Sequence, residues 1–96
     1  MPRKVVVPQP ISQAIGLLGI SRPLCVRLLT ALHNDLSNVA DEARNLRDPE
    51  DETLFLYPIR LTEESRHHLF VLAVDDTTAP DHLVLASIGH VVEDRF

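Results

Sequence analysis

The sequence predicts a small two-layer α+β domain, and the order of its apolar segments carries that prediction. A short extended segment at residues 5–7 is followed by a long region in which apolar residues recur at helical spacing. Three extended segments, at 53–61, 66–74 and 82–90, then follow one another with polar turns between them. Such consecutive strands pair antiparallel, and helices cover a face of the sheet they form. The expected order is therefore a short strand, a helical hairpin and three antiparallel strands.

Composition sets the broad class of protein. The 96 residues suffice for one domain, residues 1–96, with 45% hydrophobic and 24% charged residues. A formal net charge of -5 argues against binding nucleic acid through a broad basic surface, and it leaves a small basic patch open. The single cysteine, Cys25, is expected to be a small buried side chain, since it cannot form an internal disulfide. No segment approaches the roughly 18 apolar residues of a membrane span, so we expect a cytoplasmic protein without membrane contact.

The N-terminal region is expected to hold an edge strand and a short helix. Val5–Val7 is extended by composition, and Pro8 and Pro10 stop it, which favours an edge position. Ile11–Leu18 then has apolar residues at helical spacing, and Gly19 is a plausible end for that helix.

The main helix is predicted to begin at Ser21, a favoured N-cap, with Pro23 in its first turn. Poor helix formers at Asn34–Asn38 leave open a break into two helices. Arg47–Glu52 is expected to be a loop, because it places a proline among charged residues. The residues that form one apolar stripe along this helix are Leu24, Leu28, Ala31, Leu32, Leu36, Val39, Ala43 and Leu46.

Three strands complete the predicted sheet. Thr53–Leu61 contains Pro58, which predicts a bulge or an edge position because proline cannot donate a ladder hydrogen bond. A turn at Thr62–Ser65 leads into Leu69–Val74, which is apolar at nearly every position and is therefore expected at the centre of the sheet, covered on both faces or nearly so. The second arm of this long-looped hairpin is His82–His90.

Polar side chains gather at one end of that hairpin. If Val74 pairs near His82, antiparallel counting brings His90 opposite Arg66, with His68 on the same face. The loop length leaves the register open, and a slip of one residue would turn the other set of side chains toward that face. Arg60 or Tyr57 of the neighbouring strand is expected to join the group.

The order of the elements and three short motifs resemble the RelE/ParE superfamily of bacterial toxin–antitoxin toxins. The motifs are an aromatic-x-x-arginine segment at residues 57–60, a strand that ends in Val74-Asp75-Asp76, and a last strand that ends in Ile88-Gly89-His90. The resemblance covers most of the chain. It implies a toxin that cleaves ribosome-bound mRNA or inhibits DNA gyrase, and a cognate antitoxin protein as its partner; we expect no cofactor.

The chain also departs from the family pattern. It is acidic where RNA-cleaving members tend to be basic, and Val91 and Val92 follow the Gly-His motif where arginine or lysine is common. Pro58 stands where a basic or polar residue is common. These departures fit a divergent member, a toxin with another target, or a protein that keeps only the scaffold.

The leading hypothesis is RNA cleavage by attack of a 2′-hydroxyl. His90 or His68 would act as base or acid, because histidine exchanges protons near neutral pH. Arg66 and Arg60 would hold the phosphate, and Tyr57 would stack on a base or donate a proton.

Other interpretations of the same residues remain open. In the first, the histidines at this end of the hairpin are surface residues without a catalytic role. In the second, His67, His68 and His90 bind a divalent ion, although adjacent side chains of a strand point to opposite faces and do not chelate easily. His33 and His82 are expected to be structural or solvated.

Two classes of function without catalysis also remain, a gyrase inhibitor that acts by protein binding and an inactive scaffold that binds an antitoxin-like partner, and a homodimer is compatible with each. Residues 8–18 and the edge strand at Val5 are candidates for the antitoxin contact; the alternative is that Ile11, Ile15 and Leu18 simply pack on the main helix.

Overall fold

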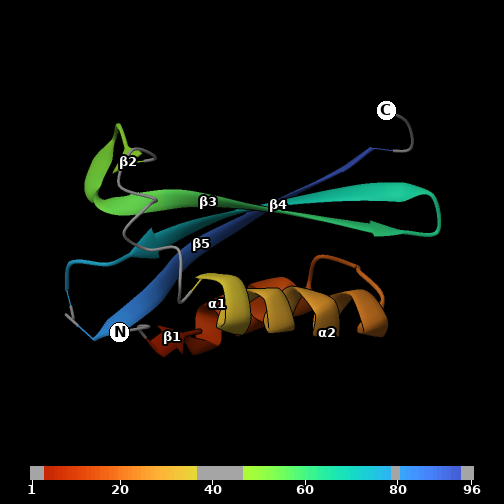
Figure 1. Cartoon of the computed structure of the whole chain (residues 1–96), viewed down its shortest axis with the longest axis horizontal. Helices are drawn as coiled ribbons and strands as arrows, with labels where there is room; N and C mark the ends of the chain where they lie inside the picture. The colour runs from red at the N-terminus through yellow and green to blue at the C-terminus, as the bar shows by residue number, and fades with distance from the viewer. Residues whose placement is uncertain (1–3, 37–46, 79–80, 94–96) are drawn as a thin grey trace.

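The computed structural model describes residues 4–36, 47–78 and 81–93, which form a small α+β domain with one sheet and one helical layer (Figure 1). The two α-helices lie together on one face of a five-stranded mixed sheet with the strand order β1-β5-β4-β3-β2. The described elements are β1 (Lys4–Val6), α1 (Gln9–Gly16), α2 (Arg22–Ala31), the π-helical turn η1 (Leu32–Leu36), β2 (Arg47–Asp48), β3 (Asp51–Glu63), β4 (Arg66–Asp75) and β5 (His82–Glu93). We call the sheet face beneath α1 and α2 the helix face, and the opposite one the open face.

The pairing confirms three consecutive antiparallel strands, β3, β4 and β5. The N-terminal strand β1 lies at the edge, as predicted, and it runs parallel to the start of β5, with Lys4 opposite His82 and Val6 opposite Val84. It begins one residue earlier than the predicted Val5–Val7. The segment between the parallel strands β1 and β5 contains both helices, which cover one face of the sheet.

The number of strands differs from the prediction, because β2 lies where residues 47–52 were expected to form a loop. This two-residue strand pairs Asp48 with Asp51 across a tight turn, in which the Asp48 carboxylate accepts the backbone N–H of Glu50. Arg47 extends to Asp76 at the end of β4, where its guanidinium donates at 2.6 Å and 2.8 Å to the two carboxylate oxygens. A pair of residues is too short to show a strand period, so only these contacts distinguish it from a loop.

The helical layer begins as the sequence predicts. The Ser21 hydroxyl accepts the backbone N–H of Leu24, and it donates to the carboxylate of Glu63 at the end of β3. Gly19, with a φ of 73°, forms the turn between the helices, although α1 itself ends at Gly16. The part of the predicted stripe beyond η1, residues 37–46, lies outside the described residues.

The core fills the space between the helices and the helix face. Leu24, Leu28 and Leu32 of the predicted stripe are fully buried there. Ile11 and Ile15 of α1 are buried in this core as well, where α1 contacts β5. The antitoxin contact proposed for residues 8–18 and Val5 stays a prediction. The buried sheet residues are Val5, Phe55, Ile59, Phe70, Leu72, Val74, Leu83 and Leu85.

The expectation that β4 is covered on both faces or nearly so holds in part for the described residues, because Ala73 is buried on the open face. Alternate side chains of β4 are buried under the helices, whereas Leu69 and Val71 lie half-buried on the open face. β4 is nevertheless central, with β5 and β3 on its two sides. Pro58 lies where β3 has no described neighbour on its outer side, as its missing N–H requires, because β2 pairs with β3 only as far as Phe55.

Candidate functional site

The register of the β4–β5 hairpin differs from the prediction. Val74 pairs with Leu85 rather than near His82, and a bulge lies between Ala73 and Val74. His82 and Leu83 pair with β1 on one edge of β5 but have no partner in β4 on the other edge, so the connection between paired residues is longer than the sequence pattern indicates. His90 consequently lies opposite Phe70, four residues from the predicted partner Arg66.

The two strands still bring His68 and His90 together, on the helix face. The Nδ1 atom of His68 and the Nε2 atom of His90 are 3.0 Å apart, and their ring planes differ by 2°. One ring therefore donates a hydrogen bond that the other accepts. His90 also stacks on Phe70, with 4.6 Å between ring centroids, and His68 is buried. This pair forms part of the wall of the core.

Burial of His90 lowers the pKa of its imidazole, and the neighbouring charge on His68 lowers it further. The ring consequently stays neutral at pH 7, in the form that the hydrogen bond to His68 needs. A neutral imidazole is a competent base. Here, however, the nitrogen that faces His68 is already occupied by that contact.

The remaining predicted site residues are separated. Arg66 is exposed at the start of β4 and pairs with Glu63 across the hairpin turn. Tyr57 lies on the helix face opposite Leu72, beyond the histidine pair and toward the centre of the sheet. Arg60 lies on the open face. Their proposed roles stay predictions.

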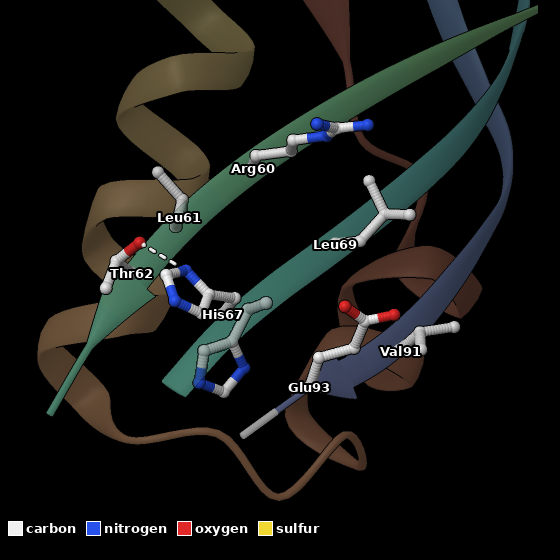
Figure 2. A pocket seen from close by; sticks show the side chains of 8 residues that line it. Arg60, Leu61, Thr62, His67, Leu69, Val91 and Glu93 are labelled. Carbon is white, nitrogen blue, oxygen red and sulfur yellow. Dashed lines mark hydrogen bonds between the residues drawn. The ribbon is translucent and has the colours of Figure 1, made fainter. Parts of the chain in front are cut away.

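A pocket of about 130 Å³ occupies the open face at this same end of the sheet (Figure 2). Two cross-strand rows supply most of its lining, and each takes one residue from β3, β4 and β5. Leu61 and His68 complete the lining. The outer row is Thr62, His67 and Glu93; the inner row is Arg60, Leu69 and Val91. Residues directly opposite in neighbouring strands project to the same face, which is why these side chains share one hollow.

The pocket combines a base, a carboxylate and a cation. The Nδ1 atom of His67 lies 3.1 Å from the hydroxyl of Thr62, which orients the ring (Figure 2). Glu93 and Arg60 are exposed, and His67 is half-buried. An imidazole beside a carboxylate, with a guanidinium one row away, is a set that can move protons and hold a phosphate.

Sequence reasoning missed His67, Glu93 and Thr62 as members of this group. No sequence signal marked this group, because its register is set by a turn at Glu64 and Ser65 with positive φ values of 50° and 69°, and neither residue is a type that favours them. Such two-residue turns suit the twist of a hairpin, and they fix its register. A four-residue turn at Thr62–Ser65 was predicted instead, which hides the pairing of Thr62 with His67.

The other candidate groups lie elsewhere. His33 is exposed on η1, and His82 lies at the far end of β5 from His90; their structural or solvated roles stay predictions. His67 and His68 project to opposite faces, and the described ranges contain no set of three His, Cys, Asp or Glu side chains able to hold a metal ion. Cys25 is half-buried against the core.

No protein-family model, curated protein or solved structure matches the chain. The functional assignment therefore rests on the geometry of the site. The helices within the described residues are all too short or too polar to cross a membrane.

Proposed function

We propose that the chain is a RelE/ParE-type toxin domain that cleaves ribosome-bound mRNA in the open-face pocket. The observation that carries the proposal is the convergence of Arg60, His67 and Glu93 from three adjacent strands into one hollow. The order of a short strand, two helices and a run of antiparallel strands supports the family resemblance. The cognate antitoxin is the partner that this proposal implies.

The pocket residues have chemically distinct roles in this proposal. The Glu93 carboxylate accepts the proton of a ribose 2′-hydroxyl, and the 2′-oxygen attacks the adjacent phosphorus. Protonated His67 gives its proton to the 5′-oxygen as the phosphorus–oxygen bond breaks. The products are a 2′,3′-cyclic phosphate and a free 5′-hydroxyl. Arg60 holds the phosphate oxygens as their negative charge grows.

The buried histidine pair fits this reaction less well. His68 and His90 bond to each other, so a phosphate would meet their paired nitrogens only after that contact broke. The earlier assignment of His68 and His90 to acid–base roles therefore becomes the alternative that the experiment must separate.

The test is primer extension on mRNA bound to ribosomes and treated with the purified protein. We expect His67→Ala and Glu93→Gln each to slow cleavage by about 100-fold or more, and Arg60→Ala by about 100-fold. The matched controls are His33→Ala and Arg22→Ala, which change exposed residues of the same types outside the pocket and should leave the rate unchanged.

Two outcomes would contradict the proposal. The first is intact mRNA with the wild-type chain, and the second is undiminished cleavage by all three pocket variants. Loss of cleavage in a folded His68→Phe variant, with full activity in His67→Ala, would return the chemistry to the helix face.

A second candidate, inhibition of DNA gyrase by protein binding, is favoured by the apolar character of the open face. Leu54, Leu56, Leu69, Val71 and Val84 lie half-buried there. A gyrase supercoiling assay with the same protein separates the two: blocked supercoiling with intact mRNA would support the inhibitor. Intact mRNA and normal supercoiling, together with binding of an antitoxin-like partner, would support the inactive scaffold.

A further inference from the structure

Among the described residues, only β1 pairs with the outer edge of β5, and it covers a short part of that edge. β1 lies beside only the first residues of β5, as far as Val84 (Figure 1). Ala86 is the residue of β5 that the bulge opposite Ala73 and Val74 leaves without a partner in β4. Beyond it, no described residue pairs with the outer side of Ser87–Glu93. Alternate backbone N–H and C=O groups of this segment therefore face outward and are available to another strand.

This edge also lacks the residues that normally prevent an exposed strand from pairing with another chain. Natural edges are usually blunted by charges, prolines or bulges. The exposed edge of β3 carries Pro58 and Arg60, whereas residues 87–92 contain neither a proline nor a charged side chain while His90 is neutral. The β3 edge therefore carries residues that oppose strand pairing and the β5 edge does not, which points to a partner at β5.

Apolar exposure is concentrated at the same place. Among the described residues, four large apolar side chains are exposed, and two of them, Val91 (54%) and Val92 (42%), are consecutive in β5. Val91 projects to the open face and Val92 to the helix face, as their partners Leu69 and His68 show. A strand added beside β5 would shield both valines, because it extends both faces of the sheet.

We propose that a second copy of the chain adds to this edge, with the two β5 strands antiparallel and His90 at the two-fold axis. The unbulged segment Ser87–Glu93 has His90 as its midpoint, so this register uses all of it. Val92 then pairs with Ile88 of the second copy, and Val91 with Gly89. Every pair joins side chains of the same face, as an antiparallel ladder requires.

The charges of the segment also permit it to pair with itself. Its single acidic residue, Glu93, falls opposite Ser87 of the second copy, and no like charges meet. Such a two-fold contact closes on itself and leaves no further free strand of the same kind. It joins the two sheets into one and places the open-face pockets on one continuous surface. The dimer does not depend on RNA cleavage, so either proposal can fail alone.

The first test is sedimentation equilibrium of the full chain across a range of concentrations. We expect wild type to dimerise and Val92→Lys to weaken the dimer by at least 10-fold, because it places a charged side chain opposite Ile88. Val26→Lys is the matched control, since Val26 is an exposed valine on α2, and it should dimerise like wild type. Circular dichroism establishes that both variants are folded.

The second test fixes the register by oxidative crosslinking in a Cys25→Ala background. His90→Cys should form a disulfide dimer, because residues at the two-fold axis lie about 4.5–5.5 Å apart between Cα atoms. Val92→Cys should not, because its two copies are offset by four residues, about 13 Å along the strands.

Three results would overturn the proposal. They are a wild-type monomer at every concentration, a dimer that survives in folded Val92→Lys, and crosslinking through position 92 in preference to position 90. A dimer that is weakened by Val26→Lys and not by Val92→Lys would place the interface at α2, and it would also contradict the proposed β5 edge.

Discussion

The two ends of β4 carry polar groups in comparable number but arrange them differently. The aspartate end consists of Asp75, Asp76, Thr77, Thr78 and Arg47. The histidine end consists of His67, His68, His90, Arg60 and Glu93. At the aspartate end the charges are satisfied by one another and by the chain, whereas at the histidine end the charged groups face a pocket.

Hydrogen bonds explain why the aspartate end has little capacity for chemistry. The Asp75 carboxylate accepts from the hydroxyl and backbone N–H of Thr78 and of Thr77. These bonds lower its pKa to about 2, the Thr78 hydroxyl having the largest effect. The Asp76 carboxylate accepts hydrogen bonds from both terminal nitrogens of the Arg47 guanidinium. A carboxylate with its acceptors occupied secures a turn and has little capacity left for chemistry.

The largest expected effect tests whether both ends depend equally on the core. Phe55, near the aspartate end, and Phe70, under His90, are both fully buried. Alanine at either position should lower the free energy of unfolding by about 3–5 kcal/mol, through lost burial and the cavity left behind. Urea denaturation measures this loss. Only Phe70→Ala should also shift the NMR signals of the His68 and His90 rings. Similar shifts from Phe55→Ala would mean that the two ends of β4 are not structurally independent.

A smaller effect separates the two arginines. Arg47→Ala leaves the largely buried Asp76 carboxylate without its bidentate partner, and it should cost about 1–3 kcal/mol of unfolding free energy. Arg60→Ala removes an exposed side chain and should change stability by less than about 0.5 kcal/mol. Equal losses in urea denaturation would mean that Arg60 is structural and would weaken its assignment as a phosphate clamp.

The pH dependence of stability should show two separate windows. For both Asp75 and His90 the folded pKa is lower than the ordinary value, so the unfolded chain binds protons more readily and stability falls as pH falls. For His90 the loss begins near pH 6.5, and for Asp75 it runs from about pH 4 to pH 2, where it is worth about 1 kcal/mol once solvent screening is allowed for.

Thermal unfolding across this pH range checks the assignment. His90→Gln should remove the upper window and Asp75→Asn the lower one, because neither replacement titrates. Persistence of the upper window in His90→Gln would assign it to another histidine.

The smallest effect concerns the orientation of His67. Thr62→Val removes the hydroxyl at 3.1 Å from Nδ1 and should change stability by less than about 0.5 kcal/mol, since the pair is exposed. The ring nitrogen NMR shifts of His67 should nevertheless change, because the hydrogen bond that selects its tautomer is lost. Unaltered shifts would show that Thr62 does not orient the ring.

The sequence by itself determined the class of fold. Helical spacing of Leu24, Leu28 and Leu32, the Ser21 cap and the extended runs of β3 to β5 are local patterns, and each produced the element expected of it. Periodicity reports which side chains share a face, and that information is sufficient for a helix that covers a sheet.

Only the tertiary structure decided which polar residues meet. The longer connection between β4 and β5, together with the bulge near Ala73, shifts the hairpin and moves His90 from Arg66 to Phe70. The two-residue turn before Arg66 sets the register in which Arg60 and His67 share a pocket. Register depends on contacts between distant segments, and a shift of one residue exchanges the two faces of a strand, so no local pattern of this chain could assign the site.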